Sequence, residues 1–142
     1  MTIYKALTIE RTYANNGQHL QQVVDYTLTG KIRKADNKPW QYESDIPELL
    51  MSVKSARATI ASDLIGETLA DKVNDYFDRV ASINWAYITK DGTIYIMGMR
   101  EFREFVMTFA TLQRDSTKNG GRMKVRLPHE TKKVIEWLSQ RA

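Results

Sequence analysis

Two side chains of this chain, Asp45 and Lys54, have the types needed for chemistry on a phosphate. Lys54 ends a short apolar stretch, residues 49–55, that reads as a β-strand. Side chains alternate between the two faces of a strand, so Val53 points one way while Ser52 and Lys54 point the other. A lysine carried by a core strand needs an acidic partner, a phosphate or solvent to receive its charge. We expect the Asp45 carboxylate to return to the same end of the sheet.

This pair fits metal-dependent hydrolysis of a phosphodiester bond. The reaction needs an activated water, neutralisation of the phosphate charge and help for the leaving oxygen. A Mg²⁺ ion held by one or two carboxylates supplies most of this. A nearby lysine then orients or deprotonates the attacking water. Asp45 and Lys54 are the minimum parts of such a site, with Mg²⁺ or Mn²⁺ as the cofactor.

Composition limits the other kinds of chemistry. The chain has 142 residues and 42% hydrophobic residues, which fits one folded domain spanning residues 1–142. Cysteine is absent, which excludes disulfides, thiolate zinc sites and cysteine nucleophiles and fits a cytoplasmic location. The first residues lack the pattern of a secretory signal, and no segment has the length of a membrane span. Phosphate-binding loop, dinucleotide-binding and nucleophile-elbow motifs are also absent.

The charge pattern favours a polyanionic partner, and DNA is the partner that we expect. The formal net charge is +4. In the segment 122–126, alternation would place three cations on one face of a strand, about 6.6 Å apart, which is close to the phosphate repeat. Each cationic run could equally be a solvated face. The predicted nucleic-acid contacts are Arg57, Lys118, Asn119, Arg122, Lys124 and Arg126.

Hydrophobic periodicity predicts a mixed central β-sheet flanked by helices, an α+β fold. Asp91-Gly92 between two alternating runs is a strong hairpin signal. Pro128 stands at a position that favours the start of a C-terminal helix. The predicted elements are an N-terminal strand within 2–13, a helix over 18–29, short strands within 31–47, a strand over 49–55, a helix over 64–81, a hairpin over 85–97, a helix over 102–109 and a helix from 128 onward.

These residues and this order of elements resemble the PD-(D/E)XK nuclease superfamily, which has a restriction-endonuclease-like core of helix, three strands, helix and strand. Asp45 matches the first acidic position, and Ser52-Val53-Lys54 matches the acidic-any-lysine signature on the third strand. The small polar Ser55 after the lysine is also usual. Gln21 stands four residues after Gly17, where the first helix of the family often carries a glutamate. The likeness covers roughly residues 17–89.

The resemblance implies a small DNA nuclease that works as a homodimer. By this likeness Asp45, Ser52 and Lys54 are the catalytic residues, and Asp45, Glu48 and Gln21 hold Mg²⁺ or Mn²⁺. The chain departs from the family at two of these positions. Ser52 stands where a metal-binding carboxylate or amide is expected, and a neutral hydroxyl is a weak ligand. Glu48, Glu43 or Asp36 could fill the gap.

Simpler interpretations stand beside each of these. Asp45 could cap a turn before Pro47, and Lys54 could protect an edge strand from aggregation. Gln21 and Arg57 could be ordinary exposed side chains. For the whole protein, the alternative is a non-catalytic phage or mobile-element protein that binds DNA or inhibits a host protein. A third interpretation is a structural subunit whose aromatic helix over 102–109 packs on a partner.

Overall fold

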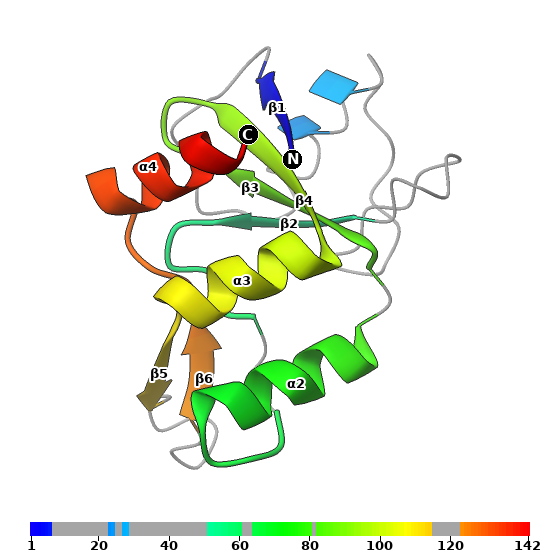
Figure 1. Cartoon of the computed structure of the whole chain (residues 1–142), viewed down its shortest axis with the longest axis vertical. Coiled ribbons are helices and arrows are strands. Elements are labelled where there is room, and N and C mark those ends of the chain that lie inside the picture. The colour runs from blue at the N-terminus through cyan, green and yellow to red at the C-terminus, as the bar shows by residue number, and fades with distance from the viewer. Residues whose placement is uncertain (7–22, 25–26, 29–50, 61–63, 81, 115–122) are drawn as a thin grey trace.

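The chain forms an α+β fold in the computed structural model (Figure 1). A mixed β-sheet and a small second sheet are accompanied by helices, which confirms the fold class predicted from the sequence. The structure describes residues 1–6, 23–24, 27–28, 51–60, 64–80, 82–114 and 123–142. The described elements are β1 (Thr2–Lys5), β2 (Met51–Ser55), α2 (Leu69–Arg79), β3 (Asn84–Ile88), β4 (Thr93–Gly98), α3 (Met99–Phe109), β5 (Thr111–Arg114), β6 (Met123–Arg126) and α4 (Lys132–Arg141).

The central sheet has the described strand order β1-β4-β3-β2. β3 and β4 form the predicted hairpin, and their antiparallel register places Tyr87 opposite Tyr95. Gly92 adopts a positive φ of 86° in the turn, a conformation that glycine takes without steric cost. The turn is closed by a hydrogen bond from the Thr89 amide to the Thr93 carbonyl, at 2.9 Å. The Asp-Gly signal therefore predicted this hairpin correctly.

β2 and β3 pair in parallel, and α2 lies between them in the sequence. Parallel strands need such a crossover because a tight turn cannot connect them. α2 begins at Leu69, five residues later than the predicted start at Leu64. The reason is local: Gly66 has a φ of 110°, and Thr68 caps the helix through a capping box with Asp71.

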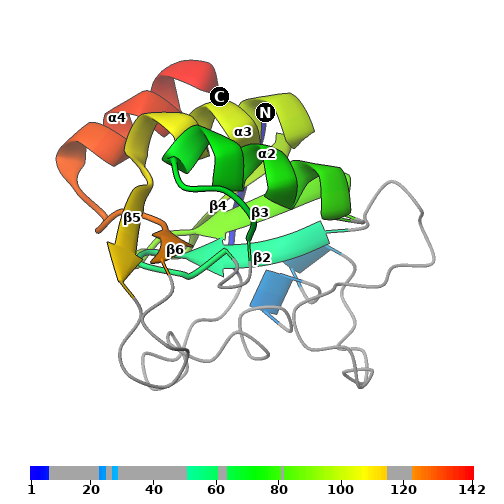
Figure 2. The same ribbon diagram turned by 90° about the horizontal axis from the view of Figure 1, so that it is seen from below.

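The helices α2, α3 and α4 pack on one face of the central sheet (Figure 2). Trp85 of β3 lies at the centre of this core, fully buried, and stacks on Phe102 of α3 with ring centroids 5.1 Å apart. The indole nitrogen of Trp85 donates a hydrogen bond of 2.9 Å to the Tyr76 hydroxyl of α2. A buried tryptophan with its nitrogen satisfied fixes how α2 and α3 sit on the sheet.

The opposite face of the sheet carries a second, smaller core. Val53 of β2 and Ala86 of β3 pack there with Val23 and Val24, which belong to a short helical stretch. Figure 2 shows that stretch in blue on the side of the sheet away from α2, α3 and α4. Because side chains alternate along β2, Lys54 lies on the face that the three helices cover.

The small sheet pairs β5 with β6 in antiparallel register. β5 was not predicted from the sequence. A bridge between Thr59 and Arg126 joins β6 to the segment that follows β2. α4 begins at Lys132 and not at Pro128, and Thr131 is its N-cap. The Pro128 carbonyl instead accepts a hydrogen bond from the Arg57 amide, which holds this segment outside the helix.

No helix in the described part of the chain combines the length and the apolar character that crossing a bilayer requires.

Candidate functional site

Lys54 is the residue around which the candidate site is built. It is the last but one residue of β2, and its side chain is half-buried. Burial lowers the pKa of the Lys54 ammonium below its usual value of 10.5, because charge is poorly solvated there. Among the described residues, none forms an ion pair or a hydrogen bond with this side chain. Lys54 is therefore an amine held partly out of water without a described partner for its charge.

Tyr87 of β3 is directly opposite Lys54 in the parallel register and lies on the same face of the sheet. Its side chain is fully buried, and its ring packs edge-on against Phe105, with centroids 5.1 Å apart. The hydroxyl has no hydrogen-bond partner among the described residues. Burial raises the pKa of Tyr87, and the negative charge of Glu130 raises it further. Lys54 and Tyr87 thus form a pair in which both groups are pushed towards their uncharged forms.

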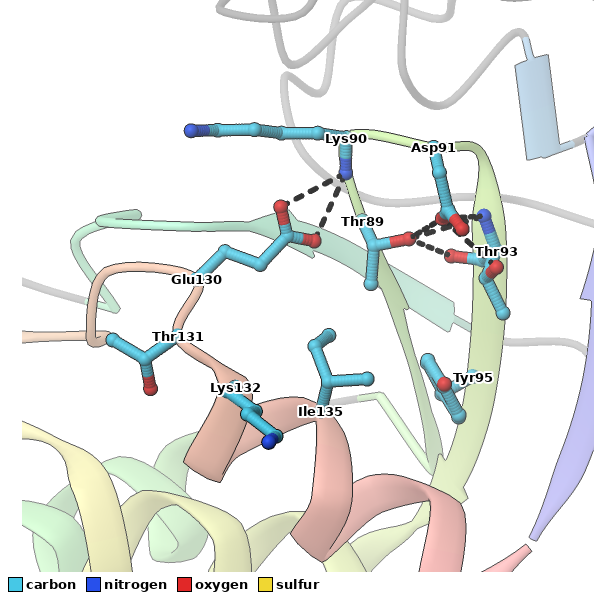
Figure 3. A pocket seen from close by; sticks show the side chains of 9 residues that line it. All are labelled: Thr89, Lys90, Asp91, Thr93, Tyr95, Glu130, Thr131, Lys132 and Ile135. Atoms are coloured by element: carbon cyan, nitrogen blue, oxygen red, sulfur yellow. Dashed lines mark hydrogen bonds between the residues drawn. The ribbon is translucent and has the colours of Figure 1, made fainter.

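A pocket of about 340 Å³ opens at the carboxyl end of β3, and one of its lining residues, Tyr95, is the register partner of Tyr87 (Figure 3). The hairpin turn forms one wall, and the start of α4 forms the other. Ligands of open α/β sheets commonly bind outside the carboxyl ends of parallel strands. The lining residues are Thr89, Lys90, Asp91, Thr93, Tyr95, Glu130, Thr131, Lys132 and Ile135.

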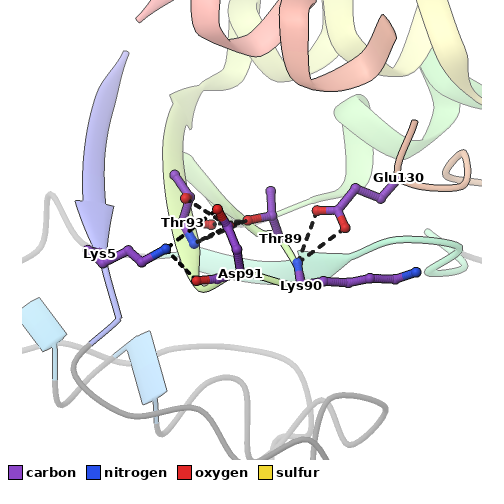
Figure 4. Close-up of polar contacts among 6 residues, drawn as sticks. All are labelled: Lys5, Thr89, Lys90, Asp91, Thr93 and Glu130. Atoms are coloured by element: carbon purple, nitrogen blue, oxygen red, sulfur yellow. Dashed lines mark hydrogen bonds and ion pairs between the residues drawn. The ribbon is translucent and has the colours of Figure 1, made fainter. Parts of the chain in front are cut away.

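Glu130 ties the two walls of the pocket together. Its carboxylate accepts hydrogen bonds of 3.0 and 3.3 Å from the Lys90 backbone amide, one to each oxygen. Figures 3 and 4 show the Lys90 side chain extended away from this contact, with its ammonium outside the pocket. The carboxylate therefore fixes the backbone at position 90 and leaves the cation of Lys90 exposed.

Asp91 organises the hairpin turn through a set of short contacts (Figure 4). Its carboxylate accepts hydrogen bonds from the Thr89 hydroxyl, the Thr93 hydroxyl and the Thr93 amide, and pairs with the Lys5 ammonium at 3.5 Å. The bond from Thr89 is the largest of the effects that lower the pKa of Asp91 to about 2. Asp91 is thus committed to the turn as a structural anion.

Several predicted site residues lie outside the described residues. These are the predicted metal ligands Asp45, Glu48 and Gln21 and the predicted DNA contacts Lys118, Asn119 and Arg122. For Ser52 the structure gives only the backbone, in β2. The described helical residues Val23 and Val24 pack on the sheet face opposite to Lys54. The convergence of Asp45 and Lys54 on one pocket stays a prediction.

The three predicted DNA contacts that the structure does describe differ from one another. Arg126 holds the fold together, because its Nε donates to the Arg57 carbonyl at 2.9 Å and its Nη1 to the Gln113 amide oxygen at 3.3 Å. Lys124 and Arg126 flank the buried Val125, while Arg122, the third cation of the predicted alternation, lies outside the described residues. Arg57 is exposed, and none of the described residues pairs with its guanidinium.

The described residues contain no group of three histidine or carboxylate side chains that could hold a metal ion. The predicted magnesium ligands Asp45, Glu48 and Gln21 lie outside the described residues, so the magnesium site stays a prediction. Sequence reasoning missed Tyr87, Glu130 and the pocket, because each depends on contacts between distant segments. The only signal for Tyr87 was its place in the alternating run before Asp91-Gly92.

No protein-family model, no curated protein and no solved structure matches this chain.

Proposed function

We propose that this protein binds DNA and hydrolyses its phosphodiester bonds with Mg²⁺ or Mn²⁺. The observation that carries the proposal is Lys54: a half-buried amine near the carboxyl end of a parallel strand, without a partner among the described residues. A phosphate is the group that would satisfy such a cation without a permanent protein partner.

The order of the elements supports the same proposal. A strand that carries the lysine, then a helix, then a strand parallel to the first is the order that the resemblance to PD-(D/E)XK nucleases implies. β2, α2 and β3 have this order, and Lys54 is on the first of the two strands. The net charge of +4 adds a general attraction to a polyanion.

Each residue of the pair has a role in this proposal. The lowered pKa of Lys54 lets the amine orient the attacking water or accept its proton. Tyr87, its register partner, has a fully buried hydroxyl that does not reach the DNA, and it keeps the surroundings of the amine poorly solvated. Mg²⁺, when bound, would neutralise charge on the phosphate, and Asp45, Glu48 and Gln21 are the residues predicted to hold it.

The second candidate function is DNA binding without cleavage. One observation favours it: Lys54 and the described helical residues Val23 and Val24 lie on opposite faces of the sheet. The resemblance places a metal ligand, Gln21, on that helix. If the predicted metal ligands do not lie near Lys54, the amine binds the phosphate without taking part in cleavage.

A paired binding and cleavage experiment separates the two functions. Plasmid, linear and branched DNA are incubated with the protein in Mg²⁺, in Mn²⁺, in Ca²⁺ and in EDTA, and affinity is measured on a short duplex in Ca²⁺. The proposal expects cleavage in Mg²⁺ or Mn²⁺ that is lost in EDTA and in Asp45→Asn. Binding without cleavage in any metal would support the second function. Absence of both would overturn DNA as the partner.

A further inference from the structure

Arg57 adopts a backbone conformation that few residues other than glycine take. Its φ is 62°, in the left-handed region, and it is the only non-glycine residue with a positive φ in the described part of the chain. The Cβ of an L-residue crowds the backbone in this region, which makes the conformation costly for arginine and free of that cost for glycine. Strained backbone of this kind is concentrated at functional sites.

The backbone on both sides of Arg57 is fixed by the segment that runs from β6 to α4. The Arg57 amide donates to the Pro128 carbonyl at 3.0 Å, and the Arg57 carbonyl accepts from the Arg126 guanidinium at 2.9 Å. The next residue is fixed as well, because the Ala58 carbonyl accepts from the Leu127 amide at 2.9 Å. A glycine at position 57 would keep these three hydrogen bonds and would remove the crowding of the Cβ.

The side chain, by contrast, has no structural task among the described residues. Arg57 is exposed, and its guanidinium makes no described ion pair, hydrogen bond or ring contact. The turn therefore fixes the backbone that carries an exposed cation, three residues after Lys54 and just beyond the carboxyl end of β2.

Other cations lie around the same end of the sheet. The segment that binds the Arg57 amide through Pro128 continues to Glu130, which binds the Lys90 amide at 3.0 Å. Lys90 is exposed, and its ammonium extends out of the pocket (Figure 4). Lys132 begins α4 two residues later; its side chain is 92% exposed and forms a surface ion pair with Glu136 at 3.9 Å. These backbone contacts bring positions 57, 90 and 132 to the same end of the sheet, and we call Arg57, Lys90 and Lys132 the cationic rim.

We propose that the cationic rim grips the backbone of duplex DNA and that Arg57 is its main phosphate contact. This inference rests on the proposed DNA binding and names the surface that performs it. Arg126, which was predicted to contact DNA, is left out because it makes hydrogen bonds within the fold. Lys90 and Lys132, which the sequence did not indicate, take its place among the expected DNA contacts. A phosphate bound by the Arg57 guanidinium would lie near the end of the strand that carries Lys54.

The test uses the opposite effects expected on folding and on binding. Arg57→Gly relieves the crowded turn, so the thermal midpoint should rise by about 2–4 °C. The same variant removes one phosphate contact, so the slope of log K against log salt should become shallower by about 0.9 and affinity should fall about fivefold near physiological salt. Fluorescence anisotropy on a duplex of about 20 base pairs in Ca²⁺, and thermal unfolding by circular dichroism, measure the two effects.

Arg100→Gln is the matched control, since it removes one exposed cation near the start of α3 and so at the opposite end of β4 from the hairpin turn. It should leave affinity within twofold of the unaltered protein, and Lys90→Gln should weaken binding as Arg57→Gly does. If the unaltered protein binds DNA while Arg57→Gly and Arg100→Gln bind equally well, the inference is overturned and DNA binding stands. No binding by the unaltered protein overturns both proposals.

Discussion

Lys54 and Tyr87 face each other across the parallel pairing of β2 with β3, and both are removed from water. Burial lowers the pKa of the amine and raises the pKa of the phenol, so both shifts favour the neutral forms. Neither side chain has a polar partner among the described residues. A core designed for stability alone would place apolar groups here, and the account therefore predicts opposite effects on stability and on function.

Replacing Lys54 by methionine should make the protein more stable. Methionine keeps the length of the side chain and removes an amine whose charge is poorly solvated in the folded state. We expect the free energy of unfolding in urea to rise by about 1 kcal/mol at neutral pH. Lys54→Arg, which keeps the charge, should not be stabilised. Destabilisation of Lys54→Met would show that the amine has a structural partner.

The stability difference between the unaltered protein and Lys54→Met should depend on pH. The pKa of Lys54 is lower in the folded state than the 10.5 of the unfolded chain, so between these values the unfolded chain binds more protons. Stability of the unaltered protein then rises with pH relative to Lys54→Met. Urea denaturation from neutral pH to above 10.5 measures this, and the gap should close at the upper end. A difference in unfolding free energy between the two proteins that does not change with pH would contradict this prediction.

Replacing Tyr87 by phenylalanine should also stabilise the fold. The hydroxyl is buried without a described hydrogen bond, so its removal should raise the free energy of unfolding by about 1 kcal/mol below pH 10. Because the folded-state pKa is raised above the unfolded value of 10.0, the unaltered protein should lose stability relative to Tyr87→Phe above that pH. Destabilisation of Tyr87→Phe would contradict this prediction, because it would show that the buried hydroxyl has a hydrogen-bond partner.

Asp91 should contribute to stability in the acid range. Its pKa of about 2 is below the usual 3.8, so its contribution is complete above pH 3.8 and is lost as pH falls towards 2. Asp91→Ala should lower the free energy of unfolding by about 1 kcal/mol at neutral pH, because the turn loses the acceptor for Thr89 and Thr93. Asp78→Ala, which removes an exposed carboxylate from α2, is the control. Equal stability of these two variants would contradict the role given to Asp91.

Local signals predicted much of the fold. The hairpin of β3 and β4 followed from Asp91-Gly92 between alternating runs, and α3 followed from apolar residues at helical spacing. The start of α4 was wrong because Pro128 makes a hydrogen bond with Arg57, which is distant in the sequence. β5 was missed because four residues that pair only with β6 carry little periodicity of their own.

The candidate site was predicted only in part, because it too depends on contacts between segments that are distant in the sequence. Alternation correctly placed Lys54 and Val53 on opposite faces of a strand. The neighbour of Lys54 depends on the register between β2 and β3, which are separated by α2, and no local pattern specifies that register. The Glu130 contact with Lys90 likewise joins segments 40 residues apart.

The rate of DNA cleavage by Lys54→Met shows whether the Lys54 amine acts on the phosphate. Single-turnover cleavage in Mg²⁺ or Mn²⁺ is compared for the unaltered protein, Lys54→Met and the control Arg100→Gln, after each has been shown to be folded. The account predicts that Lys54→Met loses at least about 100-fold in rate while Arg100→Gln retains the rate of the unaltered protein. Cleavage by Lys54→Met at the unaltered rate would contradict the claim that this amine acts on the phosphate.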